Sequence, residues 1–406
     1  MIEGAFSMRE AVIIDAVRTP IGKLNGSLTS VRPDDLAAHV IKQLMARVDL
    51  DSTLVEDVLF GCANQAGEDN RNVARMGLLL AGLPISIPGV TVNRLCGSGL
   101  EAVNQAAAAI KSGLGDVFIA GGTESMTRAP YVMMKPQVTS AKGNQTLHDT
   151  MLGWRLVNPA MNEMYPPISL GETAENVAEK YGISRAEQDD LALSSQQKAA
   201  AAIQSGRFND EIVPIEIPQR KGEPLLFRED EHVRPGTTLE TLSKLKPVFR
   251  KDGSVTAGNS SGINDGSSAI LVMEKELAER LGLKPIARVV TSAVSGVHPD
   301  YMGIGPVPAT RKALQRAGLT VDNLDLIEIN EAFAAQSVAC IKELELDMNK
   351  VNVNGGAIAL GHPLGCSGAR IVTTLVHEMQ KRDVRYGLAT MCIGVGQGIA
   401  TIIEKM

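Results

Sequence analysis

The second half of this chain repeats the order of strand-like and helix-like segments found in the first half. An apolar run at residues 287–294 corresponds to residues 11–17, and a helix expected at 367–382 corresponds to one that begins after Cys96. Strands that alternate with helices indicate βαβ units with parallel strand pairing. Two copies of one βαβαβ unit would place equivalent turns at one shared face, so we expect Cys96 and the Gly361-His362 turn to lie close together. The other segments of the second half are a helix at 310–317, a strand at 324–329, a helix at 332–343 and strands at 351–354 and 387–391.

The composition favours an α/β protein with more than one core. The chain has 406 residues, of which 44% are hydrophobic, and 39 glycines stand against seven Phe, five Tyr and one Trp. Many tight turns packed with small aliphatic side chains are typical of α/β folds. From about residue 125 the periodicity weakens, and a loop-rich insertion with helices expected at 173–181 and 185–204 separates the two halves.

Charge and cysteine usage exclude several classes of protein. The net charge is −6 and no long Lys/Arg run is present, which argues against a nucleic-acid partner. No apolar run is long enough to span a bilayer, and residues 1–7 lack the basic start and apolar core of a signal peptide. The five cysteines show no metal-binding spacing. We therefore expect a cytoplasmic protein without a metal site or a disulfide framework.

The first candidate for chemistry is Cys96, which ends a strand-like run at residues 90–95 and precedes a helix. A thiol at a helix N-terminus lies near free backbone N–H groups and the positive end of the helix dipole, which favour the nucleophilic thiolate. Gly97 and Gly99 leave room for an acyl group to approach the backbone. A small buried thiol at an ordinary tight turn is the alternative interpretation.

The second half supplies the other groups that acyl transfer requires. Asn330 stands where a strand gives way to a helix, and His362 lies in a glycine-lined turn. Cys392 ends a buried strand and is followed by Gly394, whose N–H group is free to donate. A nucleophilic thiol, a base, a second acid/base group and backbone donors for an oxyanion form an acyl-transfer site. Taken singly, each of these residues also has a structural interpretation. His362 would be a hydrogen-bonded structural histidine, Asn330 a helix cap and Cys392 part of the core packing.

A basic tract at residues 219–251 carries eight Lys/Arg residues against five acidic ones. In a chain of net charge −6, this local excess of +3 favours either a phosphorylated ligand or a solvated loop.

With these motifs in place, the chain resembles the thiolase family over residues 8–406. The resemblance implies an α/β thiolase fold, in which duplicated βαβαβ halves stack as a five-layer αβαβα sandwich with an inserted loop domain. It implies an N-terminal half at 1–124 plus 252–283, a loop domain covering CoA at 125–251 and a C-terminal half at 284–406. The four motifs that carry the resemblance are residues 93–99, 330–334, 355–363 and 392–396.

The resemblance implies an acyltransferase that cleaves 3-oxoacyl-CoA with CoA into acetyl-CoA and a shortened acyl-CoA. Cys96 would attack the 3-oxo carbon and hold the acyl group, while His362 accepts its proton. Cys392 would protonate the departing enolate and then deprotonate the incoming CoA. The thioester oxygen would be held by His362 and a water positioned by Asn330. The acyl-enzyme oxyanion would be held by the backbone N–H groups of Cys96 and Gly394.

The family also implies residues that bind CoA, which serves as a substrate, with no permanently bound cofactor. Arg234 would lie beside the nucleotide, near Thr241, which stands where many relatives carry a serine. Ser261 would contact the pantetheine, and the same resemblance places Ala257 and Phe333 at the CoA site. A homodimer, or a tetramer made of two such dimers, is the expected assembly.

Several substrates fit these features. Biosynthetic acetoacetyl-CoA thiolases tend to carry a His-Met pair where this chain has Ser169-Leu170. Leu360 and residues 363–366 and 395–398 resemble degradative thiolases, so we interpret the chain as a thiolase of fatty-acid β-oxidation. An acetoacetyl-CoA thiolase is an alternative. Residues 62–67 and 153–155 resemble β-ketoadipyl-CoA thiolases, so a thiolase for β-ketoadipyl-CoA is a second alternative.

Other classes fit less well. A decarboxylating ketoacyl synthase would replace Cys392 with His or Asn, and a non-catalytic thiolase-like CoA-binding protein would have lost Cys96 or His362. A dinucleotide-binding enzyme would need Gly-x-Gly-x-x-Gly after the first strand, which is absent.

Overall fold

The computed structural model describes residues 9–136 and 142–406. Residues 1–7, which lack the features of a signal peptide, lie outside the described residues. The first half holds β1 (Ala11–Arg18), β2 (Gly22–Lys23), α1 (Pro33–Arg47), β3 (Asp57–Gly61), α2 (Val73–Leu80), β4 (Gly89–Val92), α3 (Ser98–Lys111) and β5 (Val117–Ser125). The middle holds β6 (Tyr131–Val132), β7 (His148–Asp149), α4 (Pro159–Met164), α5 (Leu170–Tyr181), α6 (Arg185–Gln204), β8 (Ile215–Ile217), β9 (Leu225–Phe227) and α7 (Leu239–Ser243). The last part holds β10 (Asn264–Glu274), α8 (Lys275–Arg280), β11 (Ala287–Gly296), α9 (Pro306–Ala317), β12 (Leu326–Ile329), α10 (Ala334–Glu343), α11 (Ala357–Leu360), α12 (Leu364–Arg382), β13 (Tyr386–Ile393) and β14 (Gln397–Lys405).

The sheet order confirms the predicted internal repeat. The first half pairs its strands in the order β1-β10-β5-β3-β4, and the second half pairs β11-β14-β13-β12 in the same sense. In the first half, β4 pairs with β3 at the edge of the sheet. The corresponding pairing in the second half is a single parallel bridge from Ile327 of β12 to Val351. The two halves join where Val12 and Ile13 of β1 pair with Arg288 and Ala287 of β11.

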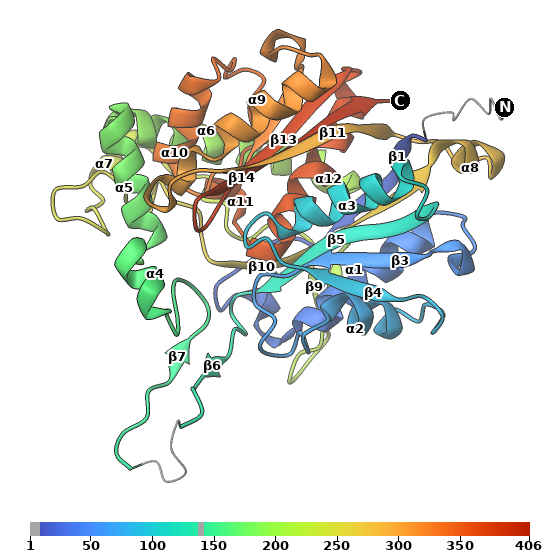
Figure 1. Cartoon of the computed structure of the whole chain (residues 1–406), viewed down its shortest axis with the longest axis horizontal. Helices are drawn as coiled ribbons and strands as arrows, with labels where there is room; N and C mark the ends of the chain where they lie inside the picture. Colours follow the sequence, from blue (N-terminus) through green and yellow to red (C-terminus); the bar gives the residue numbers. More distant parts are fainter. Residues whose placement is uncertain (1–8, 137–141) are drawn as a thin grey trace.

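The elements stack in five layers, as the resemblance implied. Helices α1 and α2 cover the outer face of the first-half strands, and α9 and α10 cover the outer face of the second-half strands. Helices α3 and α12 lie between the two sets of strands (Figure 1). Leu100 and Val103 of α3 share one core cluster with Ile371 and Leu375 of α12. The two helices that begin after Cys96 and His362 therefore meet in the central layer.

Two features of the sheet differ from the sequence prediction. Pairing is mixed rather than parallel, because β10 runs antiparallel to β1 and β5, and β14 runs antiparallel to β11 and β13. The turn at 394–396 between β13 and β14 is too short for the crossover that parallel strands need. The strand expected at 351–354 is reduced to the single bridge at Val351, because Asn352 takes a φ of 42° that ends the extended run.

The inserted segment between β5 and β10 covers one side of both halves. Its helices α5 and α6 pack against α10 of the second half, while β6 and β7 extend away from the body of the molecule (Figure 1). A buried ion-pair cluster fastens the insertion to β1: the Arg18 guanidinium contacts Glu211 at 2.6 Å and Asp230 at 2.7 Å, and all three side chains are fully buried. The domain boundaries at residues 124, 251 and 283 stay a proposal.

The contact between α3 and α12 leaves no room for a side chain at Gly368, whose added Cβ atom would overlap the backbone of Leu100. We expect Gly368→Ala to lower the free energy of unfolding by about 1–3 kcal/mol, because overpacking pushes the two helices apart. Urea denaturation measures this loss. Gly236→Ala is the matched control, because its Cβ atom meets nothing within 4 Å. Equal unfolding midpoints for the two variants would contradict the packing argument.

Candidate active site

Cys96 lies in a tight turn between β4 and α3, which the sequence predicted. Leu95, directly before it, takes a φ of 48°, a left-handed conformation that costs a residue with a Cβ atom about 1–2 kcal/mol. The turn is held by hydrogen bonds: Leu95 N donates to Asn93 Oδ1 at 2.9 Å, and Arg94 N donates to Ser98 Oγ at 2.9 Å. Strain of this kind is typical of functional turns, because the surrounding hydrogen bonds over-determine the backbone.

The Cys96 thiol is more buried than a helix N-terminus alone would indicate. Its residue is 7% exposed, and burial raises the pKa of the Cys96 thiol to about 11. Hydrogen bonds from the backbone N–H groups of Gly394 and of Cys96 itself oppose this rise in pKa. Burial therefore opposes the thiolate that the helix terminus favours, because desolvation penalises the charged form. A base is needed when the thiol reacts.

His362 provides an uncharged imidazole in the turn between α11 and α12. Gly361 takes a φ of 107°, and the His362 N–H donates to Asn264 Oδ1 at 3.0 Å. Burial lowers the pKa of His362 to about 3, and the Arg370 guanidinium acts in the same direction. The ring is therefore neutral at pH 7 and can accept a proton.

Ser367 sets the proton position on this imidazole. Its Oγ lies 2.6 Å from His362 Nδ1 and donates to the Pro363 carbonyl at 2.8 Å. A hydroxyl has one proton, so when the carbonyl takes it, Nδ1 is the donor to Oγ. This arrangement leaves the lone pair on Nε2 available for a reacting group.

Asn330 follows β12 and lies against the His362 ring. Its Nδ2 atom is 3.4 Å from Nε2 and 3.5 Å from Nδ1 of His362. The Asn330 Oδ1 atom is buried and has no hydrogen-bond partner within the described parts of the chain. The next residue anchors the loop, since Glu331 accepts from Ser195 Oγ and Asn352 Nδ2, each at 2.7 Å. An unpaired buried acceptor beside the imidazole is suited to a water molecule.

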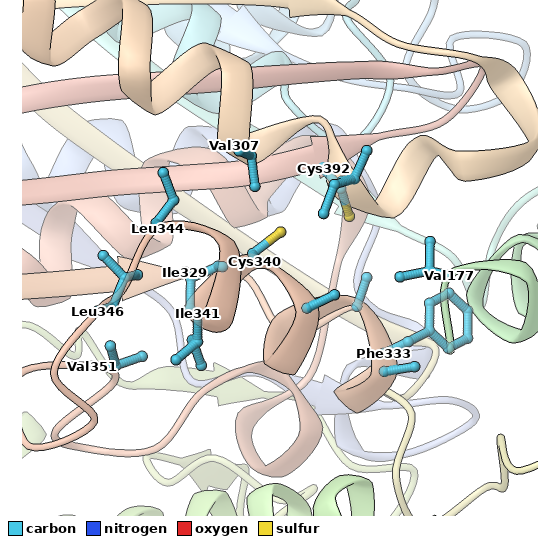
Figure 2. Close-up of a cluster of buried hydrophobic side chains, with 14 of the residues drawn as sticks. Val177, Val307, Ile329, Phe333, Cys340, Ile341, Leu344, Leu346, Val351 and Cys392 are labelled. Atoms are coloured by element: carbon cyan, nitrogen blue, oxygen red, sulfur yellow. The ribbon is translucent and has the colours of Figure 1, made fainter. Parts of the chain in front are cut away.

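Cys392 lies near the end of β13 and is 2% exposed. Burial raises the pKa of the Cys392 thiol well above its usual range, and a Cys96 thiolate would raise it further, which reflects the proximity of the two sulfurs. Gly394 follows in a turn where Val395 and Gly396 take φ values of 63° and 76°. Figure 2 shows Cys392 at the edge of a hydrophobic cluster that also contains Phe333.

One cavity of about 560 Å³ brings the predicted residues from both halves together. Cys96, His362 and Cys392 line it, and the meeting of Cys96 with the Gly361-His362 turn is the one that the internal repeat predicted. Four of the five residues assigned to CoA line the same cavity: Arg234, Ala257, Ser261 and Phe333.

An adjoining cavity of about 280 Å³ is lined by Arg234, Thr241 and Ala257. The Thr241 hydroxyl already serves α7 here, because it donates to the Thr238 carbonyl at 2.8 Å. Within the basic tract, Arg250 is paired with Glu172 at 2.9 Å. Arg234 is the arginine of the tract that lines the adjoining cavity.

Sequence reasoning missed Ser367, the unpaired oxygen of Asn330 and the anchoring role of Glu331. Ser367 lies one helical turn after Pro363, a spacing that favours a hydroxyl at the start of α12, but its bond to His362 depends on how the turn folds. The missed long strands β10 and β14 had a visible signal in the apolar run at 269–273 and the mostly apolar run at 399–403.

Comparison with known proteins decides the family. The model of the thiolase N-terminal domain matches residues 11–276, and the model of the thiolase C-terminal domain matches residues 283–405. The chain belongs to the thiolase family. It is therefore an acyltransferase that acts on acyl-CoA thioesters, as the sequence analysis predicted.

Relatives of this thiolase match over nearly their whole length. The 3-oxoadipyl-CoA/3-oxo-5,6-dehydrosuberyl-CoA thiolase of Escherichia coli (strain K12) is 56% identical over 98% of this chain and 100% of its own. An acetyl-CoA acetyltransferase of Pseudomonas aeruginosa is 51% identical with the same coverage. The crystal structure of the Bacillus anthracis acetyl-CoA acetyltransferase superposes with a TM-score of 0.93 at 44% identity, covering 98% of this chain and 99% of that chain. The thiolase fold is thereby confirmed.

The helices of the structure bear on the prediction that no segment spans a bilayer. Across residues 9–136 and 142–406, none of the helices combines the length and apolar character that a bilayer crossing requires.

Proposed function

We propose that this thiolase cleaves 3-oxoadipyl-CoA with CoA to give succinyl-CoA and acetyl-CoA. The observation that carries the proposal is the 56% identity, over the full length, to thiolases named for β-ketoadipyl-CoA or 3-oxoadipyl-CoA. The acetyl-CoA acetyltransferase of Pseudomonas aeruginosa is less similar at 51%. These relatives favour the β-ketoadipyl-CoA alternative over our interpretation as a β-oxidation enzyme, and over an acetoacetyl-CoA thiolase.

In the first half of the reaction, the Cys96 sulfur attacks the 3-oxo carbon while the thiol proton passes to His362. The neutral imidazole, with its lone pair on Nε2, supports this assignment. The bond between C2 and C3 then breaks, and the electron pair moves onto acetyl-CoA as an enolate. Cys392 protonates that enolate, which leaves a succinyl thioester on Cys96.

In the second half, Cys392 removes the proton from the incoming CoA thiol. The CoA sulfur attacks the acyl carbon, succinyl-CoA leaves, and Cys96 recovers its proton from His362. The unpaired Asn330 Oδ1 supports a water beside His362 as donor to the thioester oxygen. The backbone N–H groups of Cys96 and Gly394, which face the Cys96 sulfur, support an oxyanion site for the acyl group.

CoA would lie along the large cavity, with its nucleotide end in the adjoining one. Arg234 at their junction would pair with a phosphate, with Thr241 nearby. Ser261, Ala257 and Phe333 would contact the pantetheine arm. No permanently bound cofactor is part of the proposal. A cytoplasmic location is proposed from the five cysteines, all of which are free thiols.

A homodimer is the proposed minimal assembly. Strand β4 is an edge strand of the large sheet, and Val90 on it is 42% exposed. Ile85, just before β4, is 82% exposed. An unpaired, partly apolar edge favours pairing with a second copy of the chain. Sedimentation equilibrium tests this, since a monomer at micromolar concentration would contradict it.

The substrate proposal is tested by comparing kcat/KM for four substrates on one enzyme preparation: 3-oxoadipyl-CoA, 3-oxohexanoyl-CoA, 3-oxodecanoyl-CoA and acetoacetyl-CoA. We expect the highest value for 3-oxoadipyl-CoA. A preference for 3-oxodecanoyl-CoA would return the enzyme to β-oxidation, and a preference for acetoacetyl-CoA would make it an acetyl-CoA acetyltransferase.

A further inference from the structure

A second cavity is also lined by Cys96, and none of the residues assigned to CoA lines it. It measures about 380 Å³ and shares six lining residues with the large cavity: Cys96, Met126, Leu152, Gly153, Leu170 and Leu364. Most of the remaining lining is apolar, with Trp154 and Val395 near its mouth, 39% exposed each. Because Cys96 lines both cavities, this space is open to the acyl chain while CoA occupies the large one.

Arg155 is the one cationic side chain among the described residues that line this acyl cavity. It is half-buried, and no carboxylate of residues 9–136 or 142–406 pairs with it. A guanidinium that lines a largely apolar cavity without an acidic partner is suited to a ligand that carries its own carboxylate.

The segment that carries Arg155 is fastened to the core a few residues upstream. Thr150 is 2% exposed, accepts from Asn64 Nδ2 at 2.8 Å and donates to the Pro130 carbonyl at 2.6 Å. Asn64 itself lines the acyl cavity. These bonds hold the start of the segment against the cavity wall that Arg155 also lines.

The other charged groups near Cys96 do not compete for this role. Glu124 also lines the acyl cavity, but its carboxylate accepts backbone N–H groups of Ala63 and Gly365 at 2.8 Å each. Lys23 and Arg234 line the large cavity, on the CoA side, and not the acyl cavity.

We propose that Arg155 binds the terminal carboxylate of the acyl chain and thereby selects dicarboxylic 3-oxoacyl-CoA substrates. The inference rests on the proposed function, since 3-oxoadipyl-CoA carries a carboxylate three bonds beyond the carbon that Cys96 attacks. A planar guanidinium pairs with a carboxylate through two parallel hydrogen bonds, and the apolar walls strengthen that pair by excluding water. The Arg155 side chain holds the substrate and takes no part in bond making.

The test compares 3-oxoadipyl-CoA with 3-oxohexanoyl-CoA, which has the same six-carbon chain without the carboxylate. In Arg155→Gln, the ratio of kcat/KM for the first substrate over the second is expected to fall about 10- to 100-fold, the usual worth of a charge-assisted hydrogen bond. Arg155→Lys keeps the charge and loses the bidentate geometry, so its ratio is expected between those of Arg155→Gln and the native enzyme. Arg280→Gln, a loss of the same charge from an exposed position at the end of α8, is the control and keeps the native ratio.

A measurement on the native enzyme does not depend on the folding of any variant. The monomethyl ester of 3-oxoadipyl-CoA masks the carboxylate and is expected to react about 10- to 100-fold less efficiently than the acid. In Arg155→Gln the acid and the ester are expected to react alike.

The outcomes separate this inference from the proposed function. If the native enzyme prefers 3-oxoadipyl-CoA but Arg155→Gln loses equally on both six-carbon substrates, the Arg155 assignment is wrong and the function stands. If the native enzyme prefers 3-oxohexanoyl-CoA, the proposed function itself fails and the inference fails with it.

Discussion

Replacing Cys96 with alanine is expected to abolish formation of the acyl-enzyme and to lower kcat for thiolysis at least about 10⁴-fold, because the attacking sulfur is removed. The fold should persist, since the change removes one sulfur from a residue that is already 7% exposed. The measurement is acid-quenched peptide mapping after incubation with a 3-oxoacyl-CoA, together with the CoA-dependent cleavage rate.

The matched control for this variant is Cys340→Ala. Cys340 is also a fully buried thiol, and burial raises its pKa to about 12, but it lines neither cavity at Cys96. Its Sγ atom donates to the Gly303 carbonyl at 3.3 Å, so its loss affects packing and not the reaction. Acylation that persists in Cys96→Ala, or that disappears in Cys340→Ala, would remove Cys96 from the nucleophile's role.

Replacing Cys392 with serine is expected to separate the two steps of the reaction. Cys96 and His362 remain, so the enzyme still becomes acylated, but the hydroxyl is a much weaker acid than a thiol and exchanges protons poorly with the enolate and with CoA. We expect kcat to fall about 10²- to 10⁴-fold, the range for loss of a general acid–base group. Stopped-flow thiolysis measures the turnover and mass spectrometry measures the acylated fraction.

Cys340→Ser serves as the control, because Cys340 belongs to the same hydrophobic cluster as Cys392 (Figure 2). It introduces the same buried hydroxyl without touching the cavity. Full turnover by Cys392→Ser would assign Cys392 to the core, and failure to acylate would indicate that the serine disturbs Cys96 itself.

The internal repeat made most of the fold predictable from the sequence. Equivalent segments of two βαβαβ units occupy equivalent places in the sheet, so the meeting of Cys96 with the His362 turn followed from symmetry. The antiparallel strands β10 and β14 escaped prediction because alternation of strands and helices says nothing of a strand added after a hairpin or a long insertion. The loss of a strand after Val351 depends on the left-handed Asn352, a local conformation without a strong sequence signal.

The electrostatics of the site were less predictable than its members. A helix N-terminus is visible in a sequence, but burial raises the pKa of Cys96 to about 11, and residues of both halves and of the insertion line the cavity around it. Likewise, the hydroxyl of Ser367 and the imidazole of His362 are joined only when the turn closes. The cavity wall at Arg155 comes from the loop-rich insertion, where periodicity gave no guide to position.

The most direct test of the account is to incubate the native enzyme with 3-oxoadipyl-CoA in the absence of free CoA, quench with acid and map the modified peptide. Without CoA the second half of the reaction cannot proceed, so acetyl-CoA should be released while a succinyl group accumulates on Cys96. A succinyl adduct on any other residue, or release of acetyl-CoA without a covalent adduct, would contradict the proposed chemistry.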